Sequence, residues 1–372
     1  MPSEALDLFL ELAAVPSPSG EERAVADLVL GYVRDLGLTA DEDDTGPALG
    51  STMGNILVSV APTADGEPIF LCAHLDTVPP LDAIEPVVED GIVRNRNAAI
   101  LGGDNKSAVA VMLDAVRRIL AENRPHAGIE LLFTSKEETG LQGAYAFDAS
   151  RLRARVGYVY DQAEPPGGII LGAPSAELIE VTFHGRAAHA GMFPEEGRNA
   201  IEAAARAISE MRLGRIDDET TANIGVIEGG SAANVVPDTC RLVGEARSHD
   251  DRKLAAQVQA MQDALTFAAG VAECEVETKL TRHYTAYRFA KDDLAVRLAA
   301  GAFAACGFEP RYSLSGGAAD ANVFNQRGLQ CVNLANGMTD IHTPEESIAV
   351  ADIDAMVDVT LALVDAARGN GG

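Results

Sequence analysis

Five side chains of the types that bind metal ions stand where an apolar run ends or where a helix is expected to begin. His74 follows the apolar run 69–73, Glu138 comes shortly after the run 129–133, and Asp161 closes the segment VGYVYD. In an open α/β sheet the carboxyl ends of the strands form the ligand-binding crevice, so three strands would deliver these groups to one place. The full set exceeds the needs of one ion and predicts a pair of divalent cations: His74, Asp104, Glu138, Asp161 and His342.

Two of these ligands have neighbours that could complete a hydrolytic site. Asp76 lies two residues after His74, on the same side of an extended backbone, where it could hold the other imidazole nitrogen. Glu137 precedes Glu138, and one carboxylate of such a pair can bind a cation while the other takes a proton from water. Each pair also has an ordinary explanation: a strand-end histidine bonded to an aspartate, and a solvated acidic turn.

The other two ligands are expected at helix starts. Asp104 follows the turn Gly102-Gly103 and opens a strong helix, so its carboxylate could bridge two cations or simply complement the helix dipole. His342 precedes a segment in which Thr343 is expected to cap a helix and Glu346 to close a capping box. That helix start would hold the histidine firmly.

The elements that position these residues form a first α/β stretch that ends at about residue 173. A second capping box, Ser19 with Glu22, predicts a helix start at about residue 20. The expected helices cover 3–15, 20–36, a segment beginning at Asp104, 292–306 and the C-terminal end of the chain. The expected strands cover 55–60, 69–74, 129–134, 156–160 and 330–334.

A second domain is expected as an insertion. Proline and glycine cluster at 165–168 and at 172–174, which indicates a hinge. Beyond it, strands near 177–184, 221–228, 239–247 and 273–281 and helices near 197–212 and 250–268 follow the order β-α-β-β-α-β of a ferredoxin-like unit. The prediction is an α/β protein with a catalytic domain over 1–173 and 285–372 and an inserted α+β domain over 174–284. Exposed edge strands of that insertion predict a homodimer.

Composition excludes several classes of partner. The net charge is −27 without a basic run, which argues against nucleic acid or an anionic membrane as partner. The N-terminus has no basic start and no long apolar stretch, so an amphipathic helix is expected there and not a signal peptide. Five scattered cysteines favour a reducing, cytoplasmic location. Neither GxGxxG nor GxxxxGK[ST] is present, which weakens a nucleotide-binding interpretation.

Taken in order, the motifs resemble the M20 family of di-metal peptidases and amidohydrolases, in particular its peptidase T-like (tripeptide aminopeptidase-like) branch. The resemblance covers nearly the whole chain. It rests on HLDTVP (74–79), GGDNK (102–106), FTSKEETG (133–140), Asp161, HGRAAHAG (184–191), GGSAANVVPD (229–238), EARS (245–248), SGGAADAN (315–322) and IHTPEE (341–346). It implies a zinc-exopeptidase-like mixed-sheet catalytic domain with an inserted lid and dimerisation domain.

The resemblance also implies a role for each site residue. Two ions would share Asp104, with His74 and Asp161 on one and Glu138 and His342 on the other. Asp76 would orient His74, Glu137 would be the general base, and the peptide bond after Asp104 would be cis. His189, reaching in from the partner subunit, would stabilise the oxyanion. Asn234, Arg247 and Gly317 would contact the substrate.

The expected function is therefore hydrolysis of an amide bond in small peptides, most simply by an aminopeptidase of tripeptidase type. The two ions would be Zn²⁺, with Mn²⁺ or Co²⁺ as alternatives, because a His/Asp/Glu ligand set suits all three. Asp161 is followed by Gln162-Ala163-Glu164 where a glycine-rich run is expected of tripeptidases, which bears on the contacts to the substrate's amino end. The alternatives are an N-acyl-amino-acid deacylase or carboxypeptidase, and a non-catalytic metal-binding dimeric module.

Overall fold

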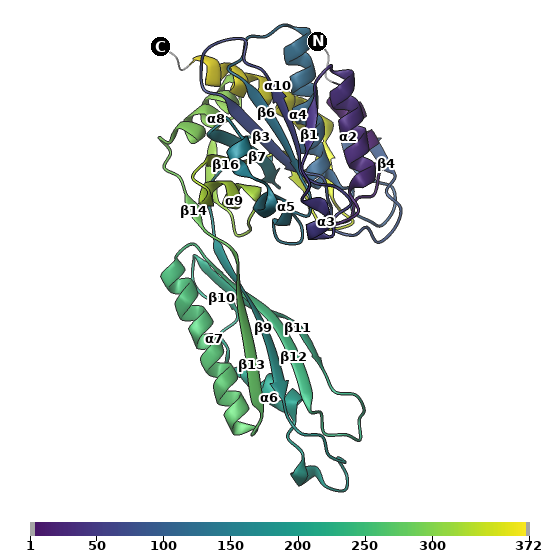
Figure 1. Cartoon of the computed structure of the whole chain (residues 1–372), viewed down its shortest axis with the longest axis vertical. Helices are drawn as coiled ribbons and strands as arrows, with labels where there is room; N and C mark the ends of the chain where they lie inside the picture. The colour runs from purple at the N-terminus through teal and green to yellow at the C-terminus, as the bar shows by residue number, and fades with distance from the viewer. Residues whose placement is uncertain (1–3, 370–372) are drawn as a thin grey trace. The chain divides into compact units, whose positions relative to one another are not determined.

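The computed structural model describes residues 4–369, and the chain divides into two compact units (Figure 1). The first unit comprises Met1–Leu171 and Arg288–Gly372, and the second comprises Gly172–Tyr287.

A mixed sheet of nine strands forms the centre of the first unit. Its order is β1-β2-β6-β3-β7-β16-β8-β14, with β15 paired to β8. The strands β6, β3, β7 and β16 run parallel, whereas β2 is antiparallel to β6. Every residue of β3 and β6 is buried, as expected for parallel strands covered on both faces. The strand bounds are Ala40–Glu42 (β1), Ile56–Val60 (β2), Ile69–His74 (β3), Ile129–Thr134 (β6), Val156–Gln162 (β7), Gly168–Ala173 (β8), Tyr287–Arg288 (β14), Arg311–Leu314 (β15) and Gln330–Ala335 (β16).

Helices cover this sheet and supply much of the core. The long helix α4 is buried over most of its length and packs against α1 and α10. The helix expected over 3–15 is α1, and Ser3 lies outside the described residues. The helix bounds are Ala5–Ala13 (α1), Arg23–Asp35 (α2), Gly46–Leu49 (α3), Gly103–Ala121 (α4), Gln142–Ala146 (α5), Ala149–Arg151 (a 3-10 turn, η1), Leu294–Ala305 (α8), Asp320–Gln326 (α9) and Val350–Gly369 (α10).

Both expected capping boxes are wrong. The helix α2 begins only at Arg23, after an N-cap residue, Glu22, that makes no side-chain cap bond. No helix follows His342: the chain turns there and enters a short strand, β18, before α10 begins. This strand belongs to a small antiparallel sheet, β17-β18-β5-β4, that the sequence patterns did not predict. Its strands are Pro86–Glu89 (β4), Ile92–Asn95 (β5), Met338–Thr339 (β17) and Ser347–Ala349 (β18).

The second unit is a five-stranded antiparallel sheet with two packed helices. The strand order is β10-β11-β12-β9-β13. The alternating residues Ile179, Val181 and Phe183 point into the core that the sheet shares with α6 and α7. The α/β fold class with an inserted ferredoxin-like unit is thus confirmed, with the short β10 added. The bounds are Ser175–His184 (β9), Pro194–Glu196 (η2), Ala200–Glu210 (α6), Gly214–Arg215 (β10), Thr220–Gly229 (β11), Thr239–Ser248 (β12), Asp251–Val271 (α7) and Glu275–Tyr284 (β13).

Two further features concern the helices and the cysteines. None of the helices over residues 4–369 has the length and apolar character needed to span a bilayer. The five cysteines are all free thiols.

Candidate active site

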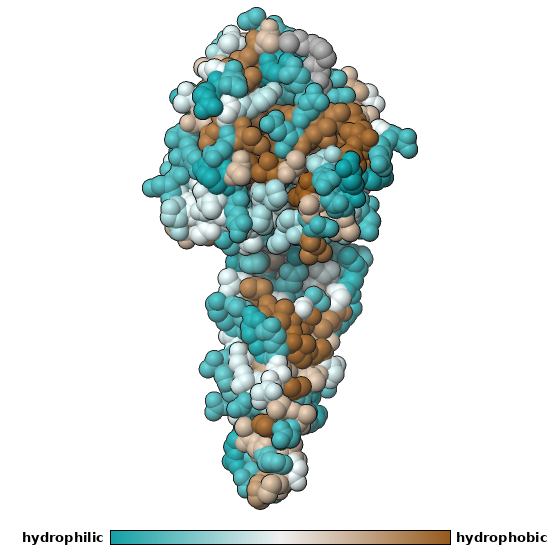
Figure 2. Space-filling model, turned by 90° about the vertical axis from the view of Figure 1, so that its right-hand side faces the viewer, coloured by the Kyte–Doolittle hydropathy of each residue, from teal (hydrophilic) through white to brown (hydrophobic). Residues whose placement is uncertain are grey.

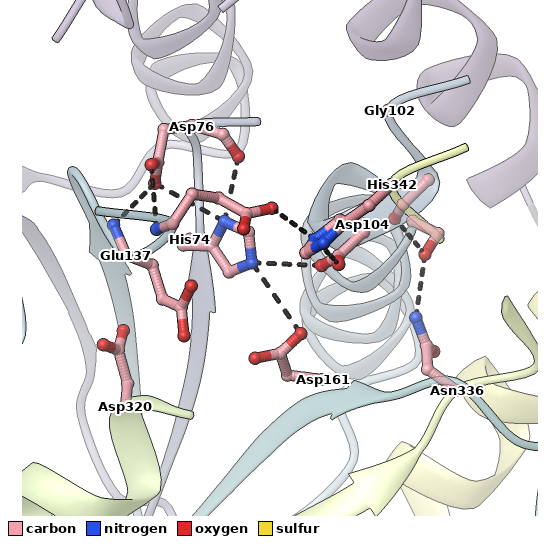
Figure 3. Close-up of polar contacts among 12 residues, drawn as sticks. His74, Asp76, Gly102, Asp104, Glu137, Asp161, Asp320, Asn336 and His342 are labelled. Atoms are coloured by element: carbon pink, nitrogen blue, oxygen red, sulfur yellow. Dashed lines mark hydrogen bonds and ion pairs between the residues drawn. The ribbon is translucent and has the colours of Figure 1, made fainter. Parts of the chain in front are cut away.

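Three neighbouring parallel strands bring the predicted ligands together. β6, β3 and β7 are adjacent in the sheet, so their carboxyl ends lie side by side. His74 is the last residue of β3, Asp161 is the penultimate residue of β7, and the turn after β6 carries Glu137 and Glu138. Figure 3 shows His74, Glu137 and Asp161 facing a common space, with Asp104 entering from the start of α4.

The carboxylate of Asp104 lies between two histidines. Its Oδ1 is 3.1 Å from His74 Nε2, and its Oδ2 is 3.1 Å from His342 Nε2. His342 Nε2 is also 2.9 Å from Glu138 Oε1, and His74 Nε2 is 3.7 Å from Asp161 Oδ1. The peptide bond between Asp104 and Asn105 is cis, as the resemblance implied. Each Asp104 oxygen thus faces a different group of potential ligands.

Asp76 contacts His74 differently from the way we expected. The imidazole Nδ1 lies 2.9 Å from the backbone carbonyl oxygen of Asp76, while the nearest carboxylate oxygen is 3.5 Å away. A proton on Nδ1 donated to that carbonyl would leave Nε2 free to bind a cation. The carboxylate itself accepts hydrogen bonds from the backbone N–H groups of Glu137 (2.9 Å) and Glu138 (3.1 Å) and from the Ser19 hydroxyl (2.6 Å). Asp76 therefore holds the Glu137–Glu138 turn as well as the histidine.

The site carries more negative charge than its histidines can balance. Burial raises the pKa of Glu137, and burial together with the charge of Asp104 raises the pKa of Asp161. Burial also disfavours a charged Asp104, but His342 and His74 outweigh it and lower the pKa of that carboxyl. The contacts to Asp104 and Glu138 raise the pKa of His342 to about 10. Buried acids of this kind ionise together only when cations compensate them.

The donor set fits divalent cations. Ligand atoms of His74, Asp104 and Glu138 lie within 4.8 Å of one another, and so do those of His74, Glu137 and Asp161. Nitrogen and carboxylate oxygen without thiolate suit zinc, manganese or cobalt. The second group includes Glu137, so distance alone does not separate the expected base from the ligands. Its role as base stays a prediction.

Two further buried acids belong to this region, and no sequence pattern indicated that they face the site. Asp320, at the start of α9, is 1% exposed and points its carboxylate toward that of Glu137 (Figure 3). Its Oδ2 accepts a hydrogen bond from the Thr134 hydroxyl (2.6 Å), while its Oδ1 has no partner. Glu346 is 2% exposed and accepts hydrogen bonds from the loop that carries Asp104. The motif SGGAADAN contains Asp320, but no pattern within it indicates which residue faces the site.

His189 and Asn234 lie together on one loop region of the second unit. The backbones of His189 and Val235 form an isolated bridge, and Ala190 N–H donates to the backbone carbonyl of Asn234. The exposed His189 imidazole accepts at Nδ1 from two backbone N–H groups, those of Gly191 and Met192, each at 3.2 Å. A neutral ring in this arrangement carries its proton on Nε2, where it can be donated.

The other two predicted substrate contacts are already engaged within the chain. Arg247 binds Glu245 through two bonds, Nε to Oε1 at 2.8 Å and Nη2 to Oε2 at 3.0 Å. A substrate carboxylate would have to use another edge of the guanidinium or displace Glu245. Gly317, in the first unit, donates its backbone N–H to the Ser315 hydroxyl at 3.1 Å. These contacts within the chain neither support nor contradict a role of Arg247 or Gly317 in substrate binding.

Comparison with known proteins places these residues in a wider context. Residues 176–272 match the family described as a peptidase dimerisation domain (M20_dimer), and residues 55–179 match peptidase family M28. The chain is 38% identical to the uncharacterized protein YqjE of Bacillus subtilis, over 97% of this chain and 98% of that protein. It is 27% identical to a succinyl-diaminopimelate desuccinylase of Xanthomonas oryzae pv. oryzae, over 98% of both chains.

Two solved structures are similar over 98% of both chains. One is the aminopeptidase PepT of Bacillus cereus, with 36% identity and a TM-score of 0.88. The other is a tripeptidase of Staphylococcus aureus, with 32% identity and a TM-score of 0.93. The similarity therefore extends through both units.

Proposed function

Because this chain belongs to the peptidase T-like branch of the M20 family and is a metallopeptidase, we propose that it is an aminopeptidase acting on tripeptide-sized substrates. The position of Asp104 supports the catalytic part of the proposal, because each of its two carboxylate oxygens lies 3.1 Å from a different histidine. A carboxylate so placed can serve two cations at once.

Two divalent ions, first of all zinc, would be held by the five predicted ligands. His74, Asp104 and Asp161 would hold one ion, and Asp104, Glu138 and His342 the other. When bound, such a pair polarises the scissile carbonyl and makes water a stronger acid. The ligand geometry supports this assignment, because the two histidines lie on opposite oxygens of Asp104.

Glu137 would move the proton. It is 8% exposed, and the bond from its backbone N–H to Asp76 fixes the main chain from which its carboxylate extends. It would accept a proton from the attacking water and then deliver it to the leaving amine. Its neighbour Glu138 would remain a ligand, so the adjacent acids would divide the two tasks.

The second unit would bind substrate and stabilise charge. His189 has an Nε2 proton to donate to a developing oxyanion, and Asn234 lies beside it in the fold. Arg247 of the second unit and the backbone at Gly317 of the first unit would contact the substrate. We place the enzyme in the cytoplasm, in keeping with its five free cysteines.

The same unit would form a homodimer. β10 pairs with β11 only at two residues, Thr221 and Ala222, which leaves the far half of β11 as a sheet edge. Val226 and Ile227 are exposed there, at 37% and 52%. Figure 2 views the molecule from the side on which β11 lies and shows apolar surface on this unit. An exposed apolar edge of this kind is suited to pairing across a two-fold axis.

Hydrolysis of one tripeptide in three forms tests the proposed activity: free, N-acetylated and C-amidated. The assay is run with zinc, manganese or cobalt, and with Glu137→Ala as the inactive control. Cleavage of the free and amidated forms, but not of the acetylated form, is expected of an aminopeptidase. Cleavage that requires a free carboxylate and tolerates acetylation would contradict it.

Cleavage that requires a free carboxylate would favour a deacylase or carboxypeptidase, and the similarity to a desuccinylase supports this alternative. The desuccinylase relative matches 98% of this chain, and its name describes removal of a succinyl group. An arginine such as Arg247 suits a carboxylate of that kind. Cleavage of none of the three forms, with both ions bound, would exclude peptide hydrolysis of this type.

A further inference from the structure

Glu346 binds three backbone N–H groups of the loop that carries Asp104. Its Oε2 accepts from Leu101 (2.7 Å) and Gly102 (2.9 Å), and its Oε1 accepts from Asp104 itself (2.9 Å). Glu346 is 2% exposed, and so these three bonds form away from solvent. Buried N–H groups rarely go unpaired, because a donor removed from water without a new partner destabilises the folded state.

The same short segment carries His342. Glu346 directly precedes β18, which pairs with both β5 and β17, so the small sheet fixes where Glu346 stands. His342, four residues earlier, adopts a left-handed φ of 65° and places Nε2 3.1 Å from Asp104 Oδ2. One segment therefore contacts Asp104 twice, at its backbone through Glu346 and at its carboxylate through His342.

We propose that Glu346 is a positioning residue that holds Asp104 between the two cation sites and thereby sets the affinity for the second ion. The inference rests on the proposed di-metal site. With the three bonds in place, the start of α4 has one orientation and both carboxylate oxygens stay aligned with their histidines. Without them, Asp104 can turn to serve one ion at the expense of the other.

Zinc binding to the metal-free protein tests this, measured as stoichiometry and affinity against a chromophoric chelator. Wild type is expected to bind two ions. In Glu346→Gln one of the two carboxylate oxygens becomes an N–H donor, so at least one loop N–H loses its acceptor. This variant should keep one tight ion and bind the second about 10- to 100-fold more weakly, the usual effect of removing a group that orients ligands. Its kcat should fall while KM changes little.

Glu345→Gln is the matched control, because it removes the same charge one residue earlier from an exposed side chain. It should bind both ions like wild type. Glu346→Asp, which keeps the charge but shortens the reach, gives a second variant if Glu346→Gln does not fold. If a folded Glu346 variant binds both ions with the affinities of wild type, the positioning role of Glu346 is wrong, while the di-metal site still stands. Fewer than two ions on wild type would overturn the di-metal function and the inference together.

Discussion

Asp76 Oδ1 accepts a hydrogen bond from the backbone N–H of Glu137 at 2.9 Å, while the Asp76 backbone carbonyl lies 2.9 Å from His74 Nδ1. One residue thus sets the position of a metal ligand through its main chain and of the proposed base through its side chain. This arrangement links the carboxyl ends of β3 and β6 more directly than a histidine–carboxylate pair would.

Asp76→Asn should therefore lower kcat by about 10- to 100-fold. The Asp76 carboxylate has two oxygens for its three donors, whereas the amide of asparagine has only one. Its NH₂ group would face a backbone N–H, which cannot accept a hydrogen bond. Ser19→Ala removes only one of the three donors to Asp76 and should cost several-fold at most. Steady-state kinetics with metal content measured on both variants checks this. Full activity in Asp76→Asn would show that the turn does not depend on this carboxylate.

Alanine variants of Glu137 and Glu138 should have different defects, one in turnover and the other in metal affinity. Glu137→Ala is expected to retain both ions and to lose at least about 10²- to 10⁴-fold in kcat, because only the proton transfer is removed. Glu138→Ala should lose affinity for one ion, since its Oε1 lies 2.9 Å from His342 Nε2. Metal analysis alongside the kinetics distinguishes the two. Loss of an ion in Glu137→Ala would identify Glu137 as a ligand.

The sequence predicts which strand-end side chains come together because the signal is local. The buried runs of β3 and β6 are short and mostly apolar, with Glu130 as an exception inside β6, and polar residues follow at the carboxyl end of each. Parallel neighbours share that end of the sheet, so the amino-acid pattern alone predicts that His74 and Glu138 meet there.

The groups that support the ligands were misread for an equally physical reason. Ser19-x-x-Glu22 and Thr343-x-x-Glu346 both have the capping-box pattern, yet Ser19 binds Asp76 and Glu346 binds the Asp104 loop. These partners lie 57 and 242 residues away along the chain. A pattern of four residues carries no information on such contacts. The small sheet escaped prediction because its strands have two to four residues each.

Asp320 should give the metal-free protein a characteristic dependence of stability on pH. Burial raises the pKa of this carboxyl to about 6, whereas in the unfolded chain it is about 3.9. Between these values the folded state binds more protons than the unfolded state, so the free energy of unfolding falls as pH rises. Asp320→Asn removes this contribution but keeps an oxygen for the Thr134 hydroxyl.

The free energy of unfolding of the variant minus that of wild type should therefore be larger at about pH 7.5 than at about pH 5. The increase should be on the order of 1–2 kcal/mol. Urea unfolding of chelator-treated protein at the two pH values measures this difference. Thr134→Val, which keeps the acid and removes a hydroxyl bond that lowers its pKa, is the comparison and should lose stability with rising pH at least as much as wild type. A stability difference between Asp320→Asn and wild type that does not change with pH would contradict the expectation.

His189 can be assigned to its own or its partner's active site by mixing subunits. Glu137→Ala and His189→Ala are each expected to be nearly inactive alone. If His189 serves the site of the partner, a heterodimer of the two variants contains one site with both residues intact. Half of the dimers in a random mixture are heterodimers, so the mixture should recover about a quarter of the wild-type activity.

Glu137→Ala mixed with Glu138→Ala is the matched control for this experiment. Both changes lie in the same turn of the first unit, so no pairing of these subunits restores a complete site, and the mixture should stay inactive. Differently tagged subunits, co-expressed and purified through both tags, ensure that only heterodimers are assayed, for which one intact site of two gives about half of the wild-type activity. Inactive heterodimers of Glu137→Ala with His189→Ala would place His189 in its own subunit's site or outside catalysis. Recovered activity would show that a complete active site contains Glu137 of one subunit and His189 of the other.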